Sequence, residues 1–345
     1  MNDLVAGSDL ARSRVREFGH VVGPRPPGPL NAITDVGGVR VGHTTLWDDT
    51  VGLYSGVTAI VPDAPATHAS LRAGFFVGNG YGKFVGATQV MELGEVETPI
   101  LLTSTMSTFR AADALLTWVL GRAKTPPTSL NPVVGEINDS WLSHTRPRPL
   151  TADHVHAALD AASPGPVAQG SVGGGTGACA LGFKAGIGTA SRRLSTPTGE
   201  AMVGVLVQAN MSGELRFRGG LLTPSCLGLP TAGPVTEEGS CVVVVATDLP
   251  CSARDLTRIA GRGVFALGRV GAAFAHGSGD YGLAFSTTRD TRSVAPALLD
   301  TAFSATMDAV EEAVLDALLA AGTVRTPSGR EAFALPHAAV RRAVA

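Results

Sequence analysis

The chain has 345 residues, of which 44% are hydrophobic and 16% are charged, and its formal net charge is −2. This length can form one large domain or two ordinary ones, and the apolar content suffices for a sizeable core. The lack of a basic cluster argues against nucleic-acid binding and against a basic membrane-binding stripe. No uncharged apolar stretch is long enough to span a membrane, and residues 1–19 contain no apolar signal-peptide core. A cytoplasmic protein is therefore expected.

The first half of the chain is predicted to combine short strands with two helices. Residues 1–29, rich in proline and glycine from position 23, are expected to form an exposed arm. Apolar periodicity predicts helices over 108–122 and 152–162, the second capped by Thr151. Short β-like segments precede these helices at 33–42, 57–61, 75–77 and 100–103.

The second half adds further strands and helices. A glycine-rich stretch at 170–177 precedes strands predicted over 180–187 and 201–209. Strands grouped with flanking helices favour a layered α+β fold, and one domain is expected over residues 30–322. The remaining predicted elements are a helix over 255–268, a strand over 281–286, a long amphipathic helix over 295–321 and a turn-rich tail with a short terminal helix over 323–345.

One segment stands out for its chemistry. Gly239 and Ser240 precede the run from Cys241 to Asp248, a β-branched sequence typical of a strand buried on both faces. The pair can be a simple turn that leads into a core strand. It can also be a processing site, because cutting the bond before Ser240 would place a new α-amine, with a pKa of about 8, beside the hydroxyl of the same residue. Nucleophile and base would then belong to one residue.

Other common signatures are weak or absent. The chain has no G-x-S-x-G motif and its four cysteines form no C-x-x-C pair, so neither an α/β-hydrolase elbow nor a zinc framework is predicted. Gly173-x-Gly175-x-x-Ala178 lacks the preceding strand that a dinucleotide site requires. His154 and His156 fall in a predicted helix, where residues two apart face in different directions.

Three further segments combine polar groups with tight turns. The segment Gly277-Ser278-Gly279-Asp280 precedes a strand and can be a turn, or its glycines can let a hydroxyl and a carboxylate approach another part of the backbone in a site. Asn210 ends a predicted apolar strand, where it can cap a turn or donate to an oxyanion. Glu136 and Asn138 lie in an acidic loop after a short strand, where a carboxylate can be solvated or can hold a substrate ammonium group.

Several long motifs occur together in chain order. They are NAITDVGGVRVGH at 31–43, the glycine-rich stretch 170–177, GFKAGIGTASR at 182–192, Gly239-Ser240 with the valine-rich strand to Asp248, and SGD at 278–280 before AFST at 284–287. In this combination the chain resembles the L-aminopeptidase/D-esterase family, which includes the β-peptidyl aminopeptidases. The resemblance extends from about residue 30 to about residue 290.

The resemblance implies an N-terminal-nucleophile hydrolase with a four-layer αββα sandwich. Such a protein is made as a precursor that cuts itself, here between Gly239 and Ser240, into an α chain of residues 1–239 and a β chain of residues 240–345. The resemblance also implies a homo-oligomer, a tetramer of αβ heterodimers. Its expected substrates are small peptides, amides or esters, and it needs no metal ion and no organic cofactor.

The family's functional residues carry over position by position. Ser240 matches the nucleophile and Asn210 matches the oxyanion donor. The serine and the acid near the free amine match Ser278 and Asp280. The loop that receives the amino end of the substrate matches Glu136 and Asn138.

The chain also departs from the family pattern. Residues 140–144 (SWLSH) replace a more typical Gly-aromatic-Leu-Asn-Asp run, and residues 249–251 (LPC) replace a proline-rich continuation. The preference for α- or β-amino acid substrates and for their configuration therefore stays open. So do two other functions: a self-cleaving acyltransferase of the ornithine acetyltransferase type, whose nucleophile is usually threonine, and a non-catalytic oligomeric binding protein, which would keep its chain intact.

Overall fold

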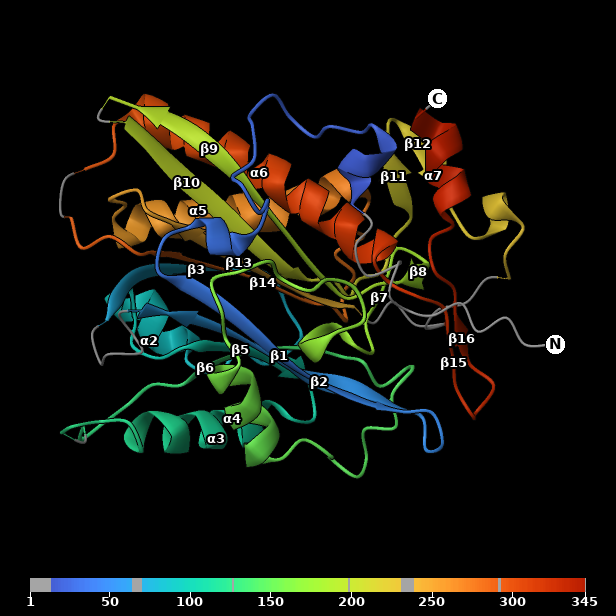
Figure 1. Cartoon of the computed structure of the whole chain (residues 1–345), viewed down its shortest axis with the longest axis horizontal. Coiled ribbons are helices and arrows are strands. Elements are labelled where there is room, and N and C mark those ends of the chain that lie inside the picture. Colours follow the sequence, from blue (N-terminus) through green and yellow to red (C-terminus); the bar gives the residue numbers. More distant parts are fainter. Residues whose placement is uncertain are drawn as a thin grey trace.

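Two β-sheets lie face to face in this protein, and helices cover the outer side of each sheet (Figure 1). The computed structural model describes residues 14–63, 70–125, 127–197, 199–230, 239–290 and 293–344. Helices α5 (Ala253–Leu267) and α6 (Pro296–Leu319) cover the first sheet, and α3 (Thr108–Leu120) and α4 (Ala152–Asp160) cover the second. The predicted α+β class and its αββα layers are therefore confirmed.

The first sheet contains the segment that stood out in the sequence. β13 (Ser240–Thr247) lies in its middle, parallel to β14 (Gly279–Ser286) and antiparallel to β10 (Gly199–Gln208). Because β13 and β14 run parallel, Ser240 and Gly279 begin their strands side by side at the same end of the sheet. The order of the six strands is completed by β9 (Ile187–Thr196) next to β10 and by β3 (Leu71–Gly80) and β4 (Glu95–Val96) beyond β14.

The second sheet is smaller and forms the lower half of the molecule in Figure 1. Its strand order is β1 (Val39–Asp48), β2 (Leu53–Pro62), β5 (Ile100–Ser104) and β6 (Val133–Ile137). A short helix, α2 (Ala87–Leu93), contacts β3. Outside the two sheets lie the hairpins β7 (Cys179–Ala180) with β8 (Phe183–Lys184), β11 (Leu215–Phe217) with β12 (Gly220–Leu222), and β15 (Val324–Arg325) with β16 (Glu331–Ala332), together with α7 (His337–Val344).

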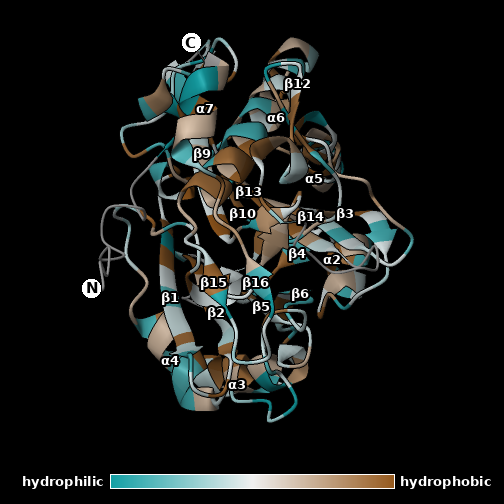
Figure 2. Cartoon of the chain, turned by 90° about the vertical axis from the view of Figure 1, so that its right-hand side faces the viewer, coloured by the Kyte–Doolittle hydropathy of each residue, from teal (hydrophilic) through white to brown (hydrophobic). Residues whose placement is uncertain are grey.

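The valine run of β13 is buried on both faces, as its sequence predicts. Val243 and Val245 pack toward α5 and α6, whereas Val242 and Val244 pack between the two sheets. This alternation follows from the two-residue period of a strand. Figure 2 shows apolar residues concentrated along the central strands and polar residues on the outer segments. Ser240, at the head of β13, is therefore held on a rigid central element.

Helix α6 is longer and more deeply buried than an ordinary surface helix. We expected an amphipathic helix over 295–321, but buried residues occur around its whole circumference and include the charged Glu312 and Asp316. The reason is that α6 contacts β9, β10 and α5 and is also covered by the N-terminal segment at Val15–Phe18. The helix prediction is confirmed, but burial in its second half extends well beyond one apolar face.

The strand predicted over 180–187 is a tight hairpin. Ala180 pairs with Phe183, and the two connecting residues, Leu181 and Gly182, have φ angles of 53° and 87°. Positive φ at both central positions is the backbone of a type I′ turn, which joins adjacent antiparallel strands. The long strand β9 begins only at Ile187, so this apolar run was misread as one element.

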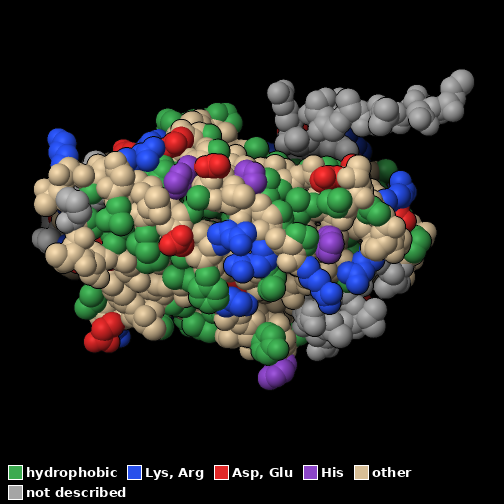
Figure 3. All heavy atoms as spheres, turned by 90° about the horizontal axis from the view of Figure 1, so that it is seen from below, with side chains coloured by type: hydrophobic (Ala, Val, Ile, Leu, Met, Phe, Trp, Pro, Cys, Tyr) green, Lys and Arg blue, Asp and Glu red, His purple; other side chains and the backbone are tan. Residues whose placement is uncertain are grey.

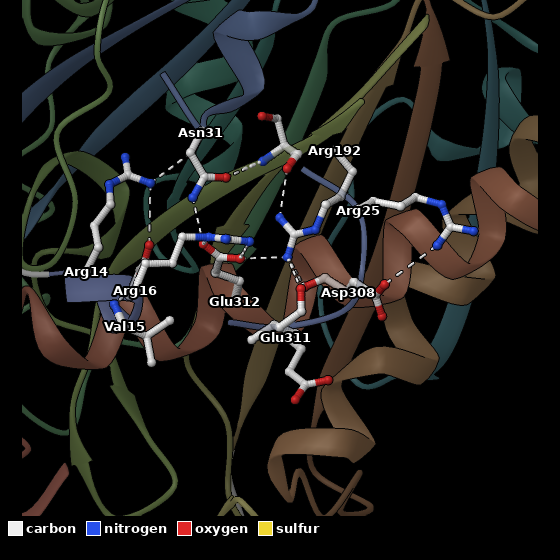
Figure 4. A network of polar contacts seen from close by, with 12 residues as sticks. Arg14, Val15, Arg16, Arg25, Asn31, Arg192, Asp308, Glu311 and Glu312 are labelled. Carbon is white, nitrogen blue, oxygen red and sulfur yellow. Dashed lines mark hydrogen bonds and ion pairs between the residues drawn. The ribbon is translucent and has the colours of Figure 1, made fainter. Parts of the chain in front are cut away.

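A buried charge network holds the N-terminal segment against α6 (Figure 4). Glu312 accepts a hydrogen bond from Arg192 at 2.6 Å and one from Arg16 at 2.5 Å, and the side chains of Glu312 and Arg192 are fully buried. Ion pairs of this kind replace the water that buried charges lose. Residues 14–29 are therefore not the exposed arm that we expected, and residues 1–13 lie outside the described residues.

The face covered by α3 and α4 carries charges of both signs (Figure 3). Lysine and arginine side chains gather near its middle, and acidic side chains lie scattered around them. Within the described ranges, none of the helices has the length and apolar character that crossing a bilayer would require.

The first turn of α5, a helix that covers the first sheet, allows a test of how this helix is capped. Ser252 caps this helix, because its Oγ accepts a hydrogen bond from the backbone N–H of Asp255 at 3.2 Å. Replacing Ser252 by alanine is expected to lower the free energy of unfolding by about 1 kcal/mol. The measurement is the thermal unfolding midpoint, with Ser195→Ala on the exposed side of β9 as the matched control. Equal midpoints for the two variants would contradict the capping role.

Candidate active site

Ser240 is fixed by one hydrogen bond from its backbone N–H and one from its side chain. Its N–H donates to the carbonyl oxygen of Asn210 at 2.6 Å, and its Oγ donates to the carbonyl oxygen of Gly239 at 2.7 Å. The residue is 3% exposed, so the hydroxyl is largely shielded from water. The Ser240 hydroxyl therefore lies directly against the peptide group that precedes it, which is the bond predicted to be cut.

Gly239 is a position where no side chain fits easily. A Cβ atom placed there would lie 3.0 Å from the Cα of Met211 and 3.2 Å from the Oγ of Ser278. The first distance is to a backbone atom, which cannot move aside as a flexible side chain can. The carbonyl oxygen of Gly239 also accepts a hydrogen bond from the N–H of Gly279 at 3.1 Å. A glycine before Ser240 thus allows the chain to approach Ser278 closely.

Ser278 and Asp280 lie behind Ser240 at the neighbouring strand. Ser278 Oγ donates to Asp280 Oδ1 at 2.9 Å, and the other carboxylate oxygen of Asp280 is buried without a hydrogen-bond partner among the described residues. Burial raises the pKa of Asp280 to about 6, although hydrogen bonds from Ser278 and from the backbone of Cys241 favour the ionised form. The pair can thus hold and stabilise a cationic group at the start of β13.

Asn210 lies just beyond the end of β10, and its carboxamide is held at both ends. Oδ1 accepts a hydrogen bond from the backbone N–H of Cys179 at 3.0 Å, and Nδ2 donates to the carbonyl oxygen of Asn138 at 3.2 Å. An amide nitrogen carries two hydrogens, so the second one can be donated to a bound oxyanion. Asn138 contributes its backbone here, because its own Oδ1 accepts from Ser140.

Glu136 is a buried carboxylate in a polar pocket. Glu136 lies on β6 and is 1% exposed. Its Oε1 accepts a hydrogen bond from the backbone N–H of Lys83 at 3.0 Å, and the Nζ of Lys83 lies 3.7 Å from the same oxygen. Oε2 is buried and has no hydrogen-bond partner among the described residues. Burial raises the pKa of Glu136, while Lys83 opposes this shift. A carboxylate with one unpaired oxygen is suited to accept hydrogen bonds from an ammonium group.

One pocket brings several of the predicted residues together. It has a volume of about 480 Å³ and is lined by Ser240, Glu136 and Asn138. Asn210 joins this group through its hydrogen bond to Asn138, whereas Ser278 and Asp280 are placed behind Ser240 and do not line the pocket. Gly277 of the segment 277–280 also lines the pocket, and the remaining lining residues carry no signal in the sequence: Gly80, Tyr81, Gly82, Lys83 and Thr105.

A second buried carboxylate beside the site was also missed. Asp139 is hydrogen-bonded by Ser55 at 2.9 Å and by Ser104 at 2.6 Å, and burial raises its pKa to about 6. Its neighbours come from β2 and β5, far away in the sequence, so no local pattern could reveal them. The acidic stretch 136–139 was the one available signal, although its first two residues end β6 and do not lie in the loop that we expected.

The weaker sequence motifs make ordinary structural contacts. Gly173–Gly175 forms a short 3-10 helix against β2, and among the described residues that precede it no strand runs directly into it as in a dinucleotide-binding unit. His154 accepts a hydrogen bond from the backbone of Thr151 at the start of α4, and His156 contacts the carbonyl of Ala114. In the described part of the chain, no group of three or more His, Cys, Asp or Glu side chains is arranged to hold a metal ion.

Comparisons with known proteins agree with this geometry. The model of peptidase family S58 matches residues 31–332. The β-peptidyl aminopeptidase BapA of Sphingosinicella xenopeptidilytica is 36% identical in an alignment of 368 positions, which covers 97% of this chain and 91% of that protein.

Two solved structures cover almost the whole fold. A β-aminopeptidase of Burkholderia sp. aligns with a TM-score of 0.89 and 37% identity, over 96% of this chain and 98% of that one. The L-aminopeptidase D-Ala-esterase/amidase of Ochrobactrum anthropi, described as a variant of the Ntn hydrolase fold, aligns with a TM-score of 0.87 and 33% identity over 96% of this chain and 98% of that one. With the family match over most of its length, the chain belongs to peptidase family S58.

Proposed function

We propose that this S58 enzyme is a self-activating serine aminopeptidase whose nucleophile, Ser240, becomes the N-terminus of a new chain. The observation that carries the proposal is the single pocket that Ser240 shares with the buried Glu136 carboxylate. A carboxylate at this place would select substrates with a free amino group, and the neighbouring hydroxyl would then attack the first carbonyl beyond that group. Such a site removes residues one at a time from the amino end.

The first reaction would be cleavage of the chain itself. Ser240 Oγ, 2.7 Å from the carbonyl oxygen of Gly239, would attack the carbonyl carbon of that residue. A C–O bond would form, the C–N bond to Ser240 would break, and the departing nitrogen would take the hydroxyl proton. Water would then hydrolyse the ester and release the Gly239 carboxylate and the free Ser240 α-amine. The N–H of Gly279, 3.1 Å from the carbonyl oxygen, would stabilise the oxyanion.

Substrate hydrolysis would use the new amine as the base. The α-amine would take the proton from Ser240 Oγ as the oxygen attacks the substrate carbonyl, and would pass it to the departing amine. Ser278 would hydrogen-bond the amine, and the Asp280 carboxylate would stabilise its protonated form. Asn210 Nδ2 would donate to the oxyanion. Water would then hydrolyse the acyl-enzyme ester and restore Ser240.

The substrate class is taken from the chemistry of the pocket and from the related enzymes. The names of the relatives describe one as a β-peptidyl aminopeptidase and another as an L-aminopeptidase and D-Ala-esterase/amidase. For this chain we propose short peptides, amides or esters with a free amino end, and a tetramer of αβ heterodimers in the cytoplasm. The decisive assay compares L-alanyl and β-alanyl p-nitroanilides with their N-acetylated forms. Hydrolysis of the acetylated compounds at equal rates would overturn the proposal.

Replacing Glu136 by glutamine tests the ammonium-binding role. Glutamine keeps an oxygen for the Lys83 N–H but removes the negative charge that would face the substrate ammonium group. Loss of a charge-assisted hydrogen bond in a buried site is expected to raise KM by about 10- to 100-fold, with a smaller change in kcat. Steady-state kinetics on alanyl p-nitroanilide check this, with the exposed Glu200→Gln as the control. A fall in kcat at constant KM would contradict a binding role.

Replacing Asp280 by asparagine tests the proposed link to the α-amine. Burial raises the pKa of Asp280 to about 6, so the wild-type carboxylate is charged at neutral pH. A carboxylate near an amine raises the pKa of that amine, and removing the charge lowers it by about 1 unit. In a plot of kcat/KM against pH, the acid limb, which reports deprotonation of the Ser240 α-amine, is therefore expected to move to lower pH in Asp280→Asn. An unchanged midpoint in pH profiles of the two enzymes would contradict the assignment.

A further inference from the structure

A fully buried lysine is connected through one peptide group to Asn210, the proposed oxyanion donor, and has no part in the mechanism described above. Lys184 has no exposed surface, and its Nζ donates to the carbonyl oxygen of Ala178 at 2.9 Å and to that of Ala185 at 2.6 Å. Burial lowers the pKa of Lys184 to about 8, while the charge of Asp139 opposes the shift. Buried ammonium groups are rare because they lose their hydration, so this one calls for an explanation.

The position of Lys184 follows from the hairpin of β7 and β8. Cys179 on β7 pairs directly with Lys184 on β8, and Ala180 forms a bridge with Met211, the residue after Asn210. Figure 1 shows this hairpin beside the ends of β10 and β13. The tight turn at Leu181 and Gly182 therefore brings the lysine back over the peptide that precedes Cys179.

The peptide group between Ala178 and Cys179 links the lysine to Asn210. Its carbonyl oxygen accepts the hydrogen bond from Lys184 Nζ, and its N–H donates to Asn210 Oδ1 at 3.0 Å. The two ends of a peptide group are coupled by resonance, so a cation on the oxygen makes the N–H a stronger donor. A stronger donor at Oδ1 withdraws electron density from the carboxamide of Asn210. It also fixes the orientation in which Nδ2 donates to the carbonyl oxygen of Asn138, a residue that lines the pocket.

We propose that Lys184 is a positioning residue for the oxyanion hole: through the Ala178–Cys179 peptide it orients and polarises the carboxamide of Asn210. The proposal rests on the proposed role of Asn210 as oxyanion donor. It explains why an ammonium group is buried near Asn210 although it neither lines the pocket nor bonds the Ser240 hydroxyl. A lysine that merely held the hairpin together would affect stability but would have no specific connection to Asn210.

A double-mutant cycle separates these roles. Lys184→Met removes the charge while keeping an unbranched side chain, and it is expected to lower kcat about tenfold when Asn210 is present. In an Asn210→Ala background the same substitution is expected to change kcat less than about twofold, because the group on which it acts is gone. Rates are expressed per active serine, titrated with a serine-directed acylating reagent, so that incomplete self-cleavage does not enter the comparison.

A second variant guards against misfolding. Lys184→Gln keeps a hydrogen-bond donor for the backbone carbonyls but lacks the charge, and it should show the same dependence on Asn210 with a smaller loss of kcat. Equal losses in both backgrounds would overturn the proposal and leave Lys184 a structural residue. Failure of both lysine variants to fold would overturn it in the same way. If Asn210→Ala alone left kcat unchanged, the oxyanion assignment in the proposed function would fail instead.

Discussion

Replacing Ser240 by alanine is expected to abolish both cleavage of the chain and hydrolysis of substrates. The substitution removes the hydroxyl that lies 2.7 Å from the carbonyl oxygen of Gly239, and with it the atom that would form both ester intermediates. Loss of a serine nucleophile typically lowers kcat about 10⁶-fold. Denaturing electrophoresis with intact mass measurement should show residues 1–239 and 240–345 as separate chains for the wild type. The variant should remain a single chain of 345 residues.

The control for this experiment is a serine that has no place in the site. Ser195 is exposed on β9, so Ser195→Ala should cleave and turn over like the wild type. Normal hydrolysis of an alanyl amide by Ser240→Ala would exclude Ser240 as the nucleophile. A wild-type chain that stays intact, yet is active, would instead exclude the self-cleavage step and leave the nucleophile open. The two results therefore test different parts of the proposal.

The architecture could be predicted where the local pattern was strong. The β-branched run 241–247 predicted a buried strand because the residues that face each side of the strand are apolar. β13 is indeed buried on both faces. Helices α3 and α5 were predicted nearly at their observed bounds, since each has a clear apolar face. The four-layer arrangement came from the resemblance to a known family and not from these patterns. Composition alone supported no more than a layered α+β fold.

Tertiary contacts explain the failures. The periodicity of 295–321 suggested one apolar face, but buried ion pairs with Arg16 and Arg192 allow the polar side of α6 to be covered as well. The hairpin of β7 and β8 was read as one strand because a Leu-Gly turn carries few of the polar residues that mark turns. Both errors arise from partners that lie far away in the sequence.

The sequence predicted several residues of the candidate site but not the residues that hold them in place. Ser240 was predicted from one segment and Glu136 and Asn138 from another, and all three line one pocket. Lys83 was not noticed, because its hydrogen bond to Glu136 spans 53 positions and no motif marks it. Lys184 stood inside a quoted motif, yet its contact with the peptide before Cys179 becomes visible only when the hairpin is folded. Residues that support a site depend on tertiary contacts, whereas residues that react leave a chemical pattern.

Replacing Asn210 by alanine is expected to lower kcat by about 10²- to 10³-fold with little change in KM. The proposed Nδ2 hydrogen bond acts on charge that develops in the transition state, and loss of one such donor usually has an effect of this size. Steady-state kinetics per titrated serine measure it. The matched control is Asn131→Ala, whose Nδ2 donates to the carbonyl of Gly86 away from the pocket, and it should leave kcat unchanged.

The same Asn210 variant should affect self-cleavage less than substrate hydrolysis. In the uncut chain the carbonyl oxygen of Gly239 is met by the N–H of Gly279 at 3.1 Å, while Asn210 Nδ2 points to Asn138. The chain's own bond and the substrate's bond would therefore use different oxyanion donors, although they share one nucleophile. Cleavage half-times and kcat, measured on the same Asn210→Ala preparation, decide the matter. Equal slowing of both reactions would mean that one oxyanion hole serves both, and the separate role assigned to Gly279 would have to be given up.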